Sequence, residues 1–132
     1  MKKNILFVCK WNRFRSKIAE ALFNKYNRNP NYKAKSAGLI KGSPIKPVSP
    51  VIKEFGIKIK GPTMGISTKL LKWHNVMIIV ADDVPKHLFK DNKKFGKKLI
   101  VWEIPDAKTD DDREIRKIVK RIKRRIKNWL KS

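Results

Sequence analysis

The chain is poor in cysteine and in acidic residues, and it contains no long hydrophobic run. One cysteine among 132 residues excludes an internal disulfide, and a reducing compartment would leave its thiol free for chemistry. No stretch approaches the roughly 18 consecutive apolar residues of a transmembrane helix. The opening MKKNILFV is too short, and too soon followed by charge, for a signal peptide. We therefore expect a cytoplasmic protein.

Acidic side chains are outnumbered by basic ones along the whole chain. There are 34 Lys and Arg residues against 11 Asp and Glu residues, which gives a formal net charge of +23. Such a field attracts anions, so phosphorylated metabolites, phosphoproteins, nucleic acids and anionic lipids are all candidate partners. The cations are spread along the chain, which equally fits a general bias toward lysine. We therefore expect contacts with nucleic acid or an anionic surface to be nonspecific.

Strand and helix signals alternate along a chain of one-domain length. With 41% hydrophobic residues, the chain can bury one core of ordinary size, so residues 1–132 are expected to form a single domain. Short apolar runs bounded by turns predict strands over residues 4–9, 33–37, 76–80 and 98–102. Helical spacing and end signals predict helices over residues 16–27, 48–55, 84–89 and 110–130. This order predicts a three-layer α/β fold with a mostly parallel sheet of about four strands.

The predicted C-terminal helix is strongly amphipathic. Its apolar positions recur at helical spacing, and they are Ile115, Ile118, Val119, Ile122, Ile126, Trp129 and Leu130. Arg and Lys occupy most of the remaining positions. We expect the apolar stripe to pack on the sheet. The alternative, a basic helix that binds membrane or nucleic acid, requires the stripe or the basic face to be free.

The single cysteine lies where the first predicted strand ends, in the sequence VCKWNRFRS. In an open α/β sheet, ligands bind beyond the carboxyl ends of strands, near the N-termini of the following helices. The loop between Cys9 and Arg15 is long enough to surround a tetrahedral oxyanion with its backbone N–H groups, above the positive end of a helix. The predicted phosphate-binding residues are Lys10, Trp11, Asn12, Arg13, Phe14, Arg15 and Ser16.

Cys9 is the candidate nucleophile. The Arg15 charge and the Ser16 hydroxyl would stabilise a thiolate over a thiol. Arg15 can also bind two phosphate oxygens, and it would bind them more strongly in the transition state. The spacing of Cys9 and Arg15 is a weak signal by itself, and a small buried cysteine that ends a strand is the alternative. The position after the first strand, the following serine and the helix that begins there favour the catalytic interpretation.

Four segments together resemble the low-molecular-weight protein tyrosine phosphatase family, which also contains thiol-linked arsenate reductases. These segments are VCKWNRFRSKIAEALF, SAGL at 36–39, VMIIVADDVP and WEIPDA at 102–107. The resemblance extends over essentially the whole chain in the same order. It implies a flavodoxin-like sheet of four parallel strands in the order 2-1-3-4, a phosphocysteine intermediate, and no metal or other cofactor. It also implies that Asn12 shapes the loop, that Ser16 bonds the nucleophile and that Ser36 supports the loop.

Asp106 matches the family's general acid, and its position supports that role independently. It follows the fourth predicted strand, at the sheet edge where Cys9 lies. A phenol leaves more readily when it is protonated as the P–O bond breaks, and the resulting carboxylate would then activate water against phosphocysteine. Two alternatives remain: Asp106 caps a turn after Pro105, or the acid is one of the aspartates at positions 110–112.

The chain departs from the family pattern at several positions. Trp11 stands where the family usually has a small residue, and one interpretation is that it forms a wall of the substrate cleft with Phe14 as its neighbour. Phe14 replaces a second loop cysteine that protects the nucleophile as a disulfide. Lys108 and Thr109 replace the aromatic residues of eukaryotic members, and this leaves phosphotyrosine specificity open. Arsenate reduction would need an external thiol, because the chain has no further cysteine.

The sequence therefore predicts a cysteine-dependent phosphatase that hydrolyses phosphate monoesters, either a phosphotyrosine protein or a small aryl phosphate. One alternative is an arsenate reductase that uses an external thiol. The other is a noncatalytic basic protein that binds anions or nucleic acid, although no recognised nucleic-acid motif is present. His74 and His87 have no partner at metal-ligand spacing. We expect them to be packing or surface residues, with no metal site.

Overall fold

The computed structural model describes residues 2–42, 50–59, 61–107 and 111–132. Four parallel strands form one sheet in the order β2-β1-β3-β4. Their bounds are β1 (Lys3–Cys9), β2 (Tyr32–Gly38), β3 (Val76–Val80) and β4 (Lys98–Trp102). The α/β class and the strand order predicted from the sequence are therefore confirmed.

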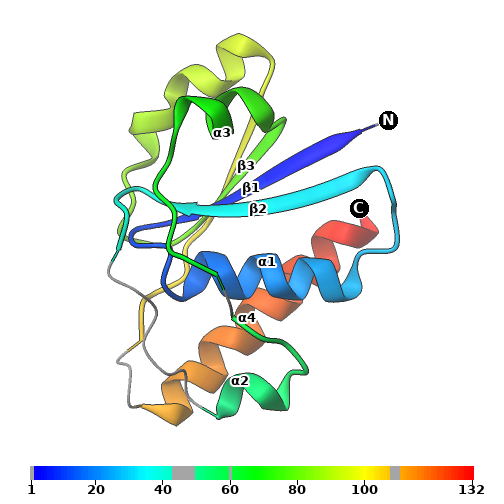
Figure 1. The fold of residues 1–132 in the computed structure, drawn as a ribbon, viewed down its shortest axis with the longest axis vertical. Helices are drawn as coiled ribbons and strands as arrows, with labels where there is room; N and C mark the ends of the chain where they lie inside the picture. The colour runs from blue at the N-terminus through cyan, green and yellow to red at the C-terminus, as the bar shows by residue number, and fades with distance from the viewer. Residues whose placement is uncertain (1, 43–49, 60, 108–110) are drawn as a thin grey trace.

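Helices cover both faces of the sheet (Figure 1). One face carries α1 (Arg15–Tyr26), α2 (Val51–Glu54) and α4 (Asp112–Lys131), and the other carries α3 (Thr68–Trp73) and the 3-10 helix η1 (Lys86–Phe95). Alternate residues of the strands point into the two layers, so that Phe7 and Ile78 pack with α1 and α4, whereas Val8 and Ile79 pack with α3 and η1. Burial on both faces explains why β3 is apolar at every position.

The register brings the carboxyl ends of the strands to one edge of the sheet. Cys9 pairs with Gly38 at the end of β1 and β2, and Val80 pairs with Trp102 at the end of β3 and β4. The loops that follow these strands therefore converge beside Cys9. This is the edge at which ligands bind in open α/β sheets.

The apolar stripe of α4 packs on the molecule, as predicted. Ile115, Ile118, Val119, Ile122 and Ile126 are buried in the same core cluster as β1 and β3. Trp129 and Leu130 are partly buried at its margin. Among the helices of the described residues, none combines the length and the apolar composition of a membrane span.

Several element bounds differ from those predicted. Helix α3 was not predicted, although Ser67 caps it by accepting a hydrogen bond from the Leu70 N–H at 3.2 Å. The helix predicted over 84–89 is η1, which starts at Lys86, kinks at Phe89 and ends at Phe95. Of the helix predicted over 48–55, the structure shows Val51–Glu54, and positions 48–49 lie outside the described residues.

Candidate active site

Cys9 lies at the base of the loop that joins β1 to α1. Its side chain is free and only 2% exposed. The Sγ atom lies 3.0 Å from the Ser16 Oγ and accepts a hydrogen bond from the Asn12 N–H at 3.3 Å. The Asn12 N–H from the loop and the Ser16 hydroxyl from the first turn of α1 therefore both lie within hydrogen-bond distance of the sulfur. Both are positioned to stabilise a negative charge there.

The loop backbone turns its carbonyl groups away from the sulfur. The carbonyl oxygens of Cys9, Lys10 and Trp11 accept hydrogen bonds from the N–H groups of residues 39, 40 and 42, at 2.8, 3.0 and 3.2 Å. In a trans peptide, the C=O of one residue and the N–H of the next point in opposite directions. The N–H groups of residues 10–12 therefore point away from the segment 39–42, and that of Asn12 reaches the Sγ atom. This arrangement is suited to binding an oxyanion.

Asn12 fixes the shape of the loop. Its φ angle of 56° lies in the left-handed region, which asparagine tolerates better than most residues. Its side-chain amide donates to the Ser16 Oγ at 2.8 Å and to the Ser36 Oγ at 3.0 Å, and its Oδ1 accepts from the Met64 N–H at 2.8 Å. Because the Ser16 oxygen accepts from Asn12, its hydroxyl proton is available to donate to the Cys9 sulfur.

Ser36 supports this network from β2. It accepts from Asn12, and its hydroxyl donates to the Glu20 Oε1 at 2.5 Å. Gly38, at the end of the same strand, has no room for a side chain. A Cβ atom there would lie 2.6 Å from the Trp11 carbonyl carbon and 2.7 Å from the Asn12 nitrogen. A side chain at position 38 would therefore displace the loop. Glu20 is a residue that the sequence analysis did not identify.

Arg15 lies almost entirely inside the protein, with 2% of its side chain exposed. Its guanidinium donates to the Ile104 carbonyl at 2.9 Å and to the two carboxylate oxygens of Asp83 at 2.9 and 3.2 Å. Asp82 and Asp106 lie 3.6 and 3.8 Å from the same group. The guanidinium is thus held in one orientation at the sheet edge next to Cys9, and three carboxylates surround it.

Asp82 and Asp83 were also not identified from the sequence. A signal was present, because both follow the buried strand β3 at the sheet edge that carries Cys9. Their side chains are 50% and 36% exposed, and their carboxylate oxygens lie 3.6 and 2.9 Å from the Arg15 guanidinium.

Asp106 lies on the loop after β4, where the sequence predicted it. One of its carboxylate oxygens accepts a hydrogen bond from the Ala107 N–H at 2.9 Å, and the other is directed toward Arg15. The side chain is 49% exposed, so it is accessible to solvent.

Two of the three alternative acids lie in the described part of the chain, at the start of α4. Asp111 caps α4 by accepting from the Glu114 N–H at 3.1 Å, and Asp112 lies in the first turn of that helix. Asp110, Lys108 and Thr109 lie outside the described residues. The geometry therefore brings Asp106 into the Arg15 cluster and gives Asp111 a structural role.

An apolar rim borders the loop on the side of the segment 38–42. Trp11 is 37% exposed, Ile40 51% and Met64 47%. The Lys10 ammonium lies 5.2 Å from the centre of the Trp11 ring. Phe14 packs against the core cluster that contains α1, and the aliphatic stem of Arg13 lies beside Gly42.

The two histidines lie away from this site. His74 is buried, its Nδ1 lies 3.2 Å from the Leu70 carbonyl, and its Nε2 lies 3.2 Å from the Asn92 amide. Burial, together with the nearby Lys97 charge, lowers the pKa of His74 below its ordinary value of 6.5. His87 is exposed on η1. In the parts of the chain that the structure describes, no group of three or more His, Cys, Asp and Glu side chains is arranged to hold a metal ion.

The family model of low molecular weight phosphotyrosine protein phosphatase matches residues 4–132. The chain belongs to this family. Its enzyme class is accordingly that of a hydrolase, and the resemblance seen in the sequence is confirmed. A comparison with curated proteins gave no significant match.

Several solved structures are similar to this chain. The low molecular weight protein tyrosine phosphatase from T. tengcongensis is 21% identical, with a TM-score of 0.81, and the alignment covers 98% of this chain and 99% of that one. A YwlE mutant from Bacillus subtilis is 17% identical, with a TM-score of 0.81 and coverages of 98% and 97%. The arsenate reductase from Archaeoglobus fulgidus is 25% identical, with a TM-score of 0.72 and coverages of 97% and 99%. The fold is therefore shared by proteins of differing activity.

Proposed function

We propose that this phosphatase hydrolyses phosphate monoesters through a phosphocysteine intermediate on Cys9. The observation that carries the proposal is the environment of the Cys9 sulfur. The Asn12 N–H and the Ser16 hydroxyl both meet it, at 3.3 and 3.0 Å, at the base of a loop whose carbonyl groups point outward. A thiolate and a bound phosphate dianion would both be stabilised by this arrangement.

The first step is an in-line displacement at phosphorus. The Cys9 thiolate forms the S–P bond as the ester P–O bond breaks, and Asp106 gives its proton to the departing oxygen. Arg15 is held by Ile104 and Asp83, and it binds the equatorial oxygens as their negative charge spreads in the transition state.

The second step releases phosphate. The Asp106 carboxylate takes a proton from water as the water oxygen attacks phosphorus, and the S–P bond breaks to return the Cys9 thiolate. The products are the free alcohol or phenol and inorganic phosphate, and the acid is again protonated. Because this cycle needs a reduced thiol, we also infer a reducing location such as the cytoplasm.

Substitution of the nucleophile and of the phosphate-binding arginine tests this mechanism. Hydrolysis of p-nitrophenyl phosphate should proceed in the presence of a chelator and should be inhibited by vanadate. Cys9→Ser and Arg15→Ala should each lose activity by about three orders of magnitude or more, because each group acts on the reacting phosphate. His87→Gln, on the exposed side of η1, is the matched control and should keep full activity. Full activity in either active-site variant contradicts the covalent mechanism.

The rim next to the loop supports an aryl phosphate as the substrate. Trp11, Ile40 and Met64 offer apolar surface on one side of the site, where a phenyl ring can be buried. A phosphotyrosine peptide and phenyl phosphate should therefore be hydrolysed with higher kcat/KM than an alkyl phosphate such as glycerol phosphate. Trp11→Gly should reduce this preference without abolishing turnover.

A phosphorylated guanidinium is a second candidate substrate. Structures of YwlE arginine phosphatase are among those similar to this chain. Asp82, Asp83 and Asp106 give the mouth of the site three carboxylates, which could pair with a cationic leaving group. Hydrolysis of phosphoarginine and of phosphotyrosine in the same peptide context compares the two classes directly.

Arsenate reduction with an external thiol is the third candidate. Cys9 would attack arsenate with loss of water, an external thiol would then attack the Cys9 sulfur and release arsenite, and a second external thiol would reduce the mixed disulfide. The sole cysteine of the chain makes this external supply necessary. Arsenate-dependent oxidation of added glutathione, measured beside p-nitrophenyl phosphate hydrolysis, separates the two activities.

A further inference from the structure

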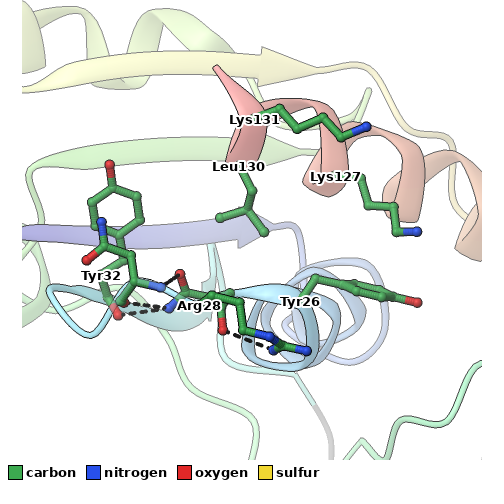
Figure 2. Close-up of a pocket in the computed structure, with 8 residues that line it drawn as sticks. Tyr26, Arg28, Tyr32, Lys127, Leu130 and Lys131 are labelled. Atoms are coloured by element: carbon green, nitrogen blue, oxygen red, sulfur yellow. Dashed lines mark hydrogen bonds between the residues drawn. The ribbon is translucent and has the colours of Figure 1, made fainter.

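Two hollows meet at the end of the molecule where the strands begin. The first lies between the C-terminal turns of α4 and the turn after α1, with a volume of about 660 Å3. Figure 2 shows Lys127 and Lys131 on the α4 side, Tyr26 and Arg28 on the other side, and Leu130 between them. The second hollow, of about 580 Å3, lies across the same turn. The two share four lining residues: Asn27, Arg28, Asn29 and Tyr32.

We call the two hollows together the basic groove. Its cations are Arg28, Lys33, Lys35, Lys127 and Lys131, and all five are exposed. Among the described residues that line it, none is acidic. A track of one sign of charge along a concave surface concentrates the field and attracts a polyanion.

Aromatic rings interleave with these cations. Tyr26 and Tyr32 line the first hollow, and Tyr32 and Trp73 line the second. The Lys127 ammonium lies 4.8 Å from the centre of the Tyr26 ring, and the Lys35 ammonium lies 4.6 Å from that of Trp73. All three rings are partly exposed. Lys25 and Lys123 also lie over the Tyr26 ring, and Lys3 lies over the Tyr32 ring, so a base that stacks on these rings must displace a flexible ammonium group.

The turn at the centre of the groove is held in place by its own hydrogen bonds. The Asn27 amide donates to the Asn29 carbonyl at 3.0 Å, and the Asn27 Oδ1 accepts from the Asn29 N–H at 3.0 Å. Arg28 donates to the Lys25 carbonyl at 3.0 Å. The central cation is therefore ordered before any ligand binds, which reduces the entropy cost of binding.

The basic groove is separate from the candidate active site. Tyr32 pairs with Lys3 at the beginning of the parallel strands, whereas Gly38 pairs with Cys9 at their end. Six residues of extended strand, about 20 Å, separate Tyr32 from Gly38, and three residues, about 10 Å, separate Lys35 from it. The turn after α1 and the C-terminus lie at the same end of the molecule in Figure 1, opposite the end of β1. Cys9 is buried and lines neither hollow, so the contacts of the groove residues do not include the nucleophile.

We propose that the basic groove binds single-stranded nucleic acid without sequence specificity. Cations that follow a backbone, alternating with aromatic rings on which bases stack, are the features that such binding requires. A duplex keeps its bases stacked on one another and cannot use Tyr26, Tyr32 or Trp73. An anionic membrane is flat and would not reach rings that line a hollow. An acidic peptide supplies the charges but no bases.

Fluorescence anisotropy with a labelled dT12 oligonucleotide tests the electrostatic part of the proposal. If all five groove cations contact phosphates, the logarithm of the binding constant should fall with the logarithm of salt concentration with a slope of about −3.5. The triple variant Arg28→Gln, Lys33→Gln, Lys127→Gln should reduce the slope by about 2 and weaken binding about 10- to 100-fold at low salt.

A charge-matched triple variant provides the control. Lys69→Gln, Lys86→Gln and Lys90→Gln remove three exposed cations of α3 and η1 that line neither hollow. This variant should weaken dT12 binding by less than about threefold. An equal loss in both triple variants would show that only the overall charge matters, and it would overturn the proposal. Thermal unfolding of each variant checks that it is folded.

The proposed stacking of bases on the aromatic rings is tested by comparing dT12 with a polyanion that carries phosphates but no bases. Tyr26→Leu keeps an apolar side chain at that position, and it should weaken dT12 binding about 5- to 100-fold. It should leave the binding of inorganic polyphosphate unchanged. Equal effects on both ligands, or tighter binding to duplex DNA or to phosphatidylserine vesicles than to dT12, would contradict a single-strand site. Cys9→Ser should bind dT12 as the wild type does, so this result is independent of the proposed catalysis.

Discussion

Arg15 carries a full charge at a position almost closed to water. An unpaired charge at such a depth is very costly, so a buried arginine needs partners. The Ile104 carbonyl and the Asp83 carboxylate supply them, and Asp82 and Asp106 lie within 4 Å. The same partners hold the guanidinium at the sheet edge beside Cys9. One set of contacts thus serves both the burial of the charge and the orientation proposed for phosphate binding.

Replacement of Asp106 should produce a loss that depends on the leaving group. Asp106→Asn should slow the hydrolysis of phenyl phosphate by about 10² to 10⁴, because phenolate is a strong base and leaves poorly without a proton. The loss should be smaller for p-nitrophenyl phosphate, since nitrophenolate leaves readily by itself. Single-turnover measurements of phosphocysteine formation isolate this step from the later attack of water.

Asp111→Asn is the matched control for this experiment. Asparagine also caps helices well, so α4 should stay intact and both substrates should react as in the wild type. Equal slowing of the two substrates by Asp106→Asn would contradict the general-acid assignment. A loss in Asp111→Asn that depends on the leaving group would transfer that role to the start of α4.

Oxidation of Cys9 should be poorly reversible. Cys9 is the one cysteine of the chain, so the chain contains no other thiol. A sulfenic acid on Cys9 therefore has no internal partner, and further peroxide should drive it to the irreversible sulfinic acid. After prolonged peroxide treatment, dithiothreitol should restore only a small part of the activity. Complete recovery, with no sulfinic acid found by mass spectrometry, would contradict this prediction.

The placement of Cys9, Arg15 and Ser16 follows from the sequence, but the placement of the carboxylates around Arg15 does not. Cys9, Arg15 and Ser16 are adjacent to one strand and one helix, so local order already places them together. Asp82 and Asp83 reach Arg15 only because β3 lies beside β1 in the sheet. Tertiary packing decides which of the carboxylates at this sheet edge faces the Arg15 guanidinium. Glu20 bonds Ser36 across the α1–β2 contact for the same reason.

At the scale of elements, the strands were easier to predict than the short helices. The strands β3 and β4 have the predicted bounds, because each is a short run of five and four apolar residues, respectively, that polar residues enclose. Helix α3 has six residues, of which only Leu70 is buried, so its hydrophobic periodicity is too short to detect. The end of η1 extends past the apolar positions that predicted it, into a charged segment. Packing against the sheet, chiefly against β4, determines where η1 lies.

His74 connects α3, β3 and η1, and it should make stability depend on pH. The folded protein holds its ring neutral, because burial and Lys97 lower the pKa of His74 below 6.5. The Leu70 carbonyl accepts from one ring nitrogen, and the Asn92 amide donates to the other. The unfolded chain binds a proton more tightly. Stability should therefore be full above pH 6.5 and decrease as the pH falls toward the pKa of the folded state.

Urea unfolding between pH 5 and pH 8 measures this dependence. His74→Gln removes the titrating group, and it should flatten the decrease below pH 6.5 even if the protein is less stable at every pH. His87→Gln, whose side chain is exposed on η1, should keep the wild-type slope. If His74→Gln showed the same slope as the wild type, the pH dependence would have to come from other groups.

At the scale of the whole molecule, charge is distributed unevenly around the candidate active site. The chain carries a net charge of +23, yet three of its 11 acidic residues gather around Arg15. The negative charges of these three carboxylates make the electrostatic potential at the site less positive than that of the surrounding surface. Long-range attraction of an anionic substrate is therefore a property of the surface, whereas its final binding is a property of the loop.

These two contributions should separate in their response to salt. Exposed charges are screened within about 10 Å at 0.1 M salt, whereas buried groups are screened much less. Raising NaCl from 20 to 500 mM should lower kcat/KM for p-nitrophenyl phosphate about 3- to 10-fold, mainly through a higher KM. The kcat should change little, because Arg15 and Cys9 are only 2% exposed. The control triple variant Lys69→Gln, Lys86→Gln, Lys90→Gln lowers the net charge by three and should reduce this salt dependence slightly.

A kcat that falls with salt as steeply as kcat/KM would contradict this prediction. It would show that salt screens the catalytic groups themselves, and that the loop does not shelter the phosphate as proposed.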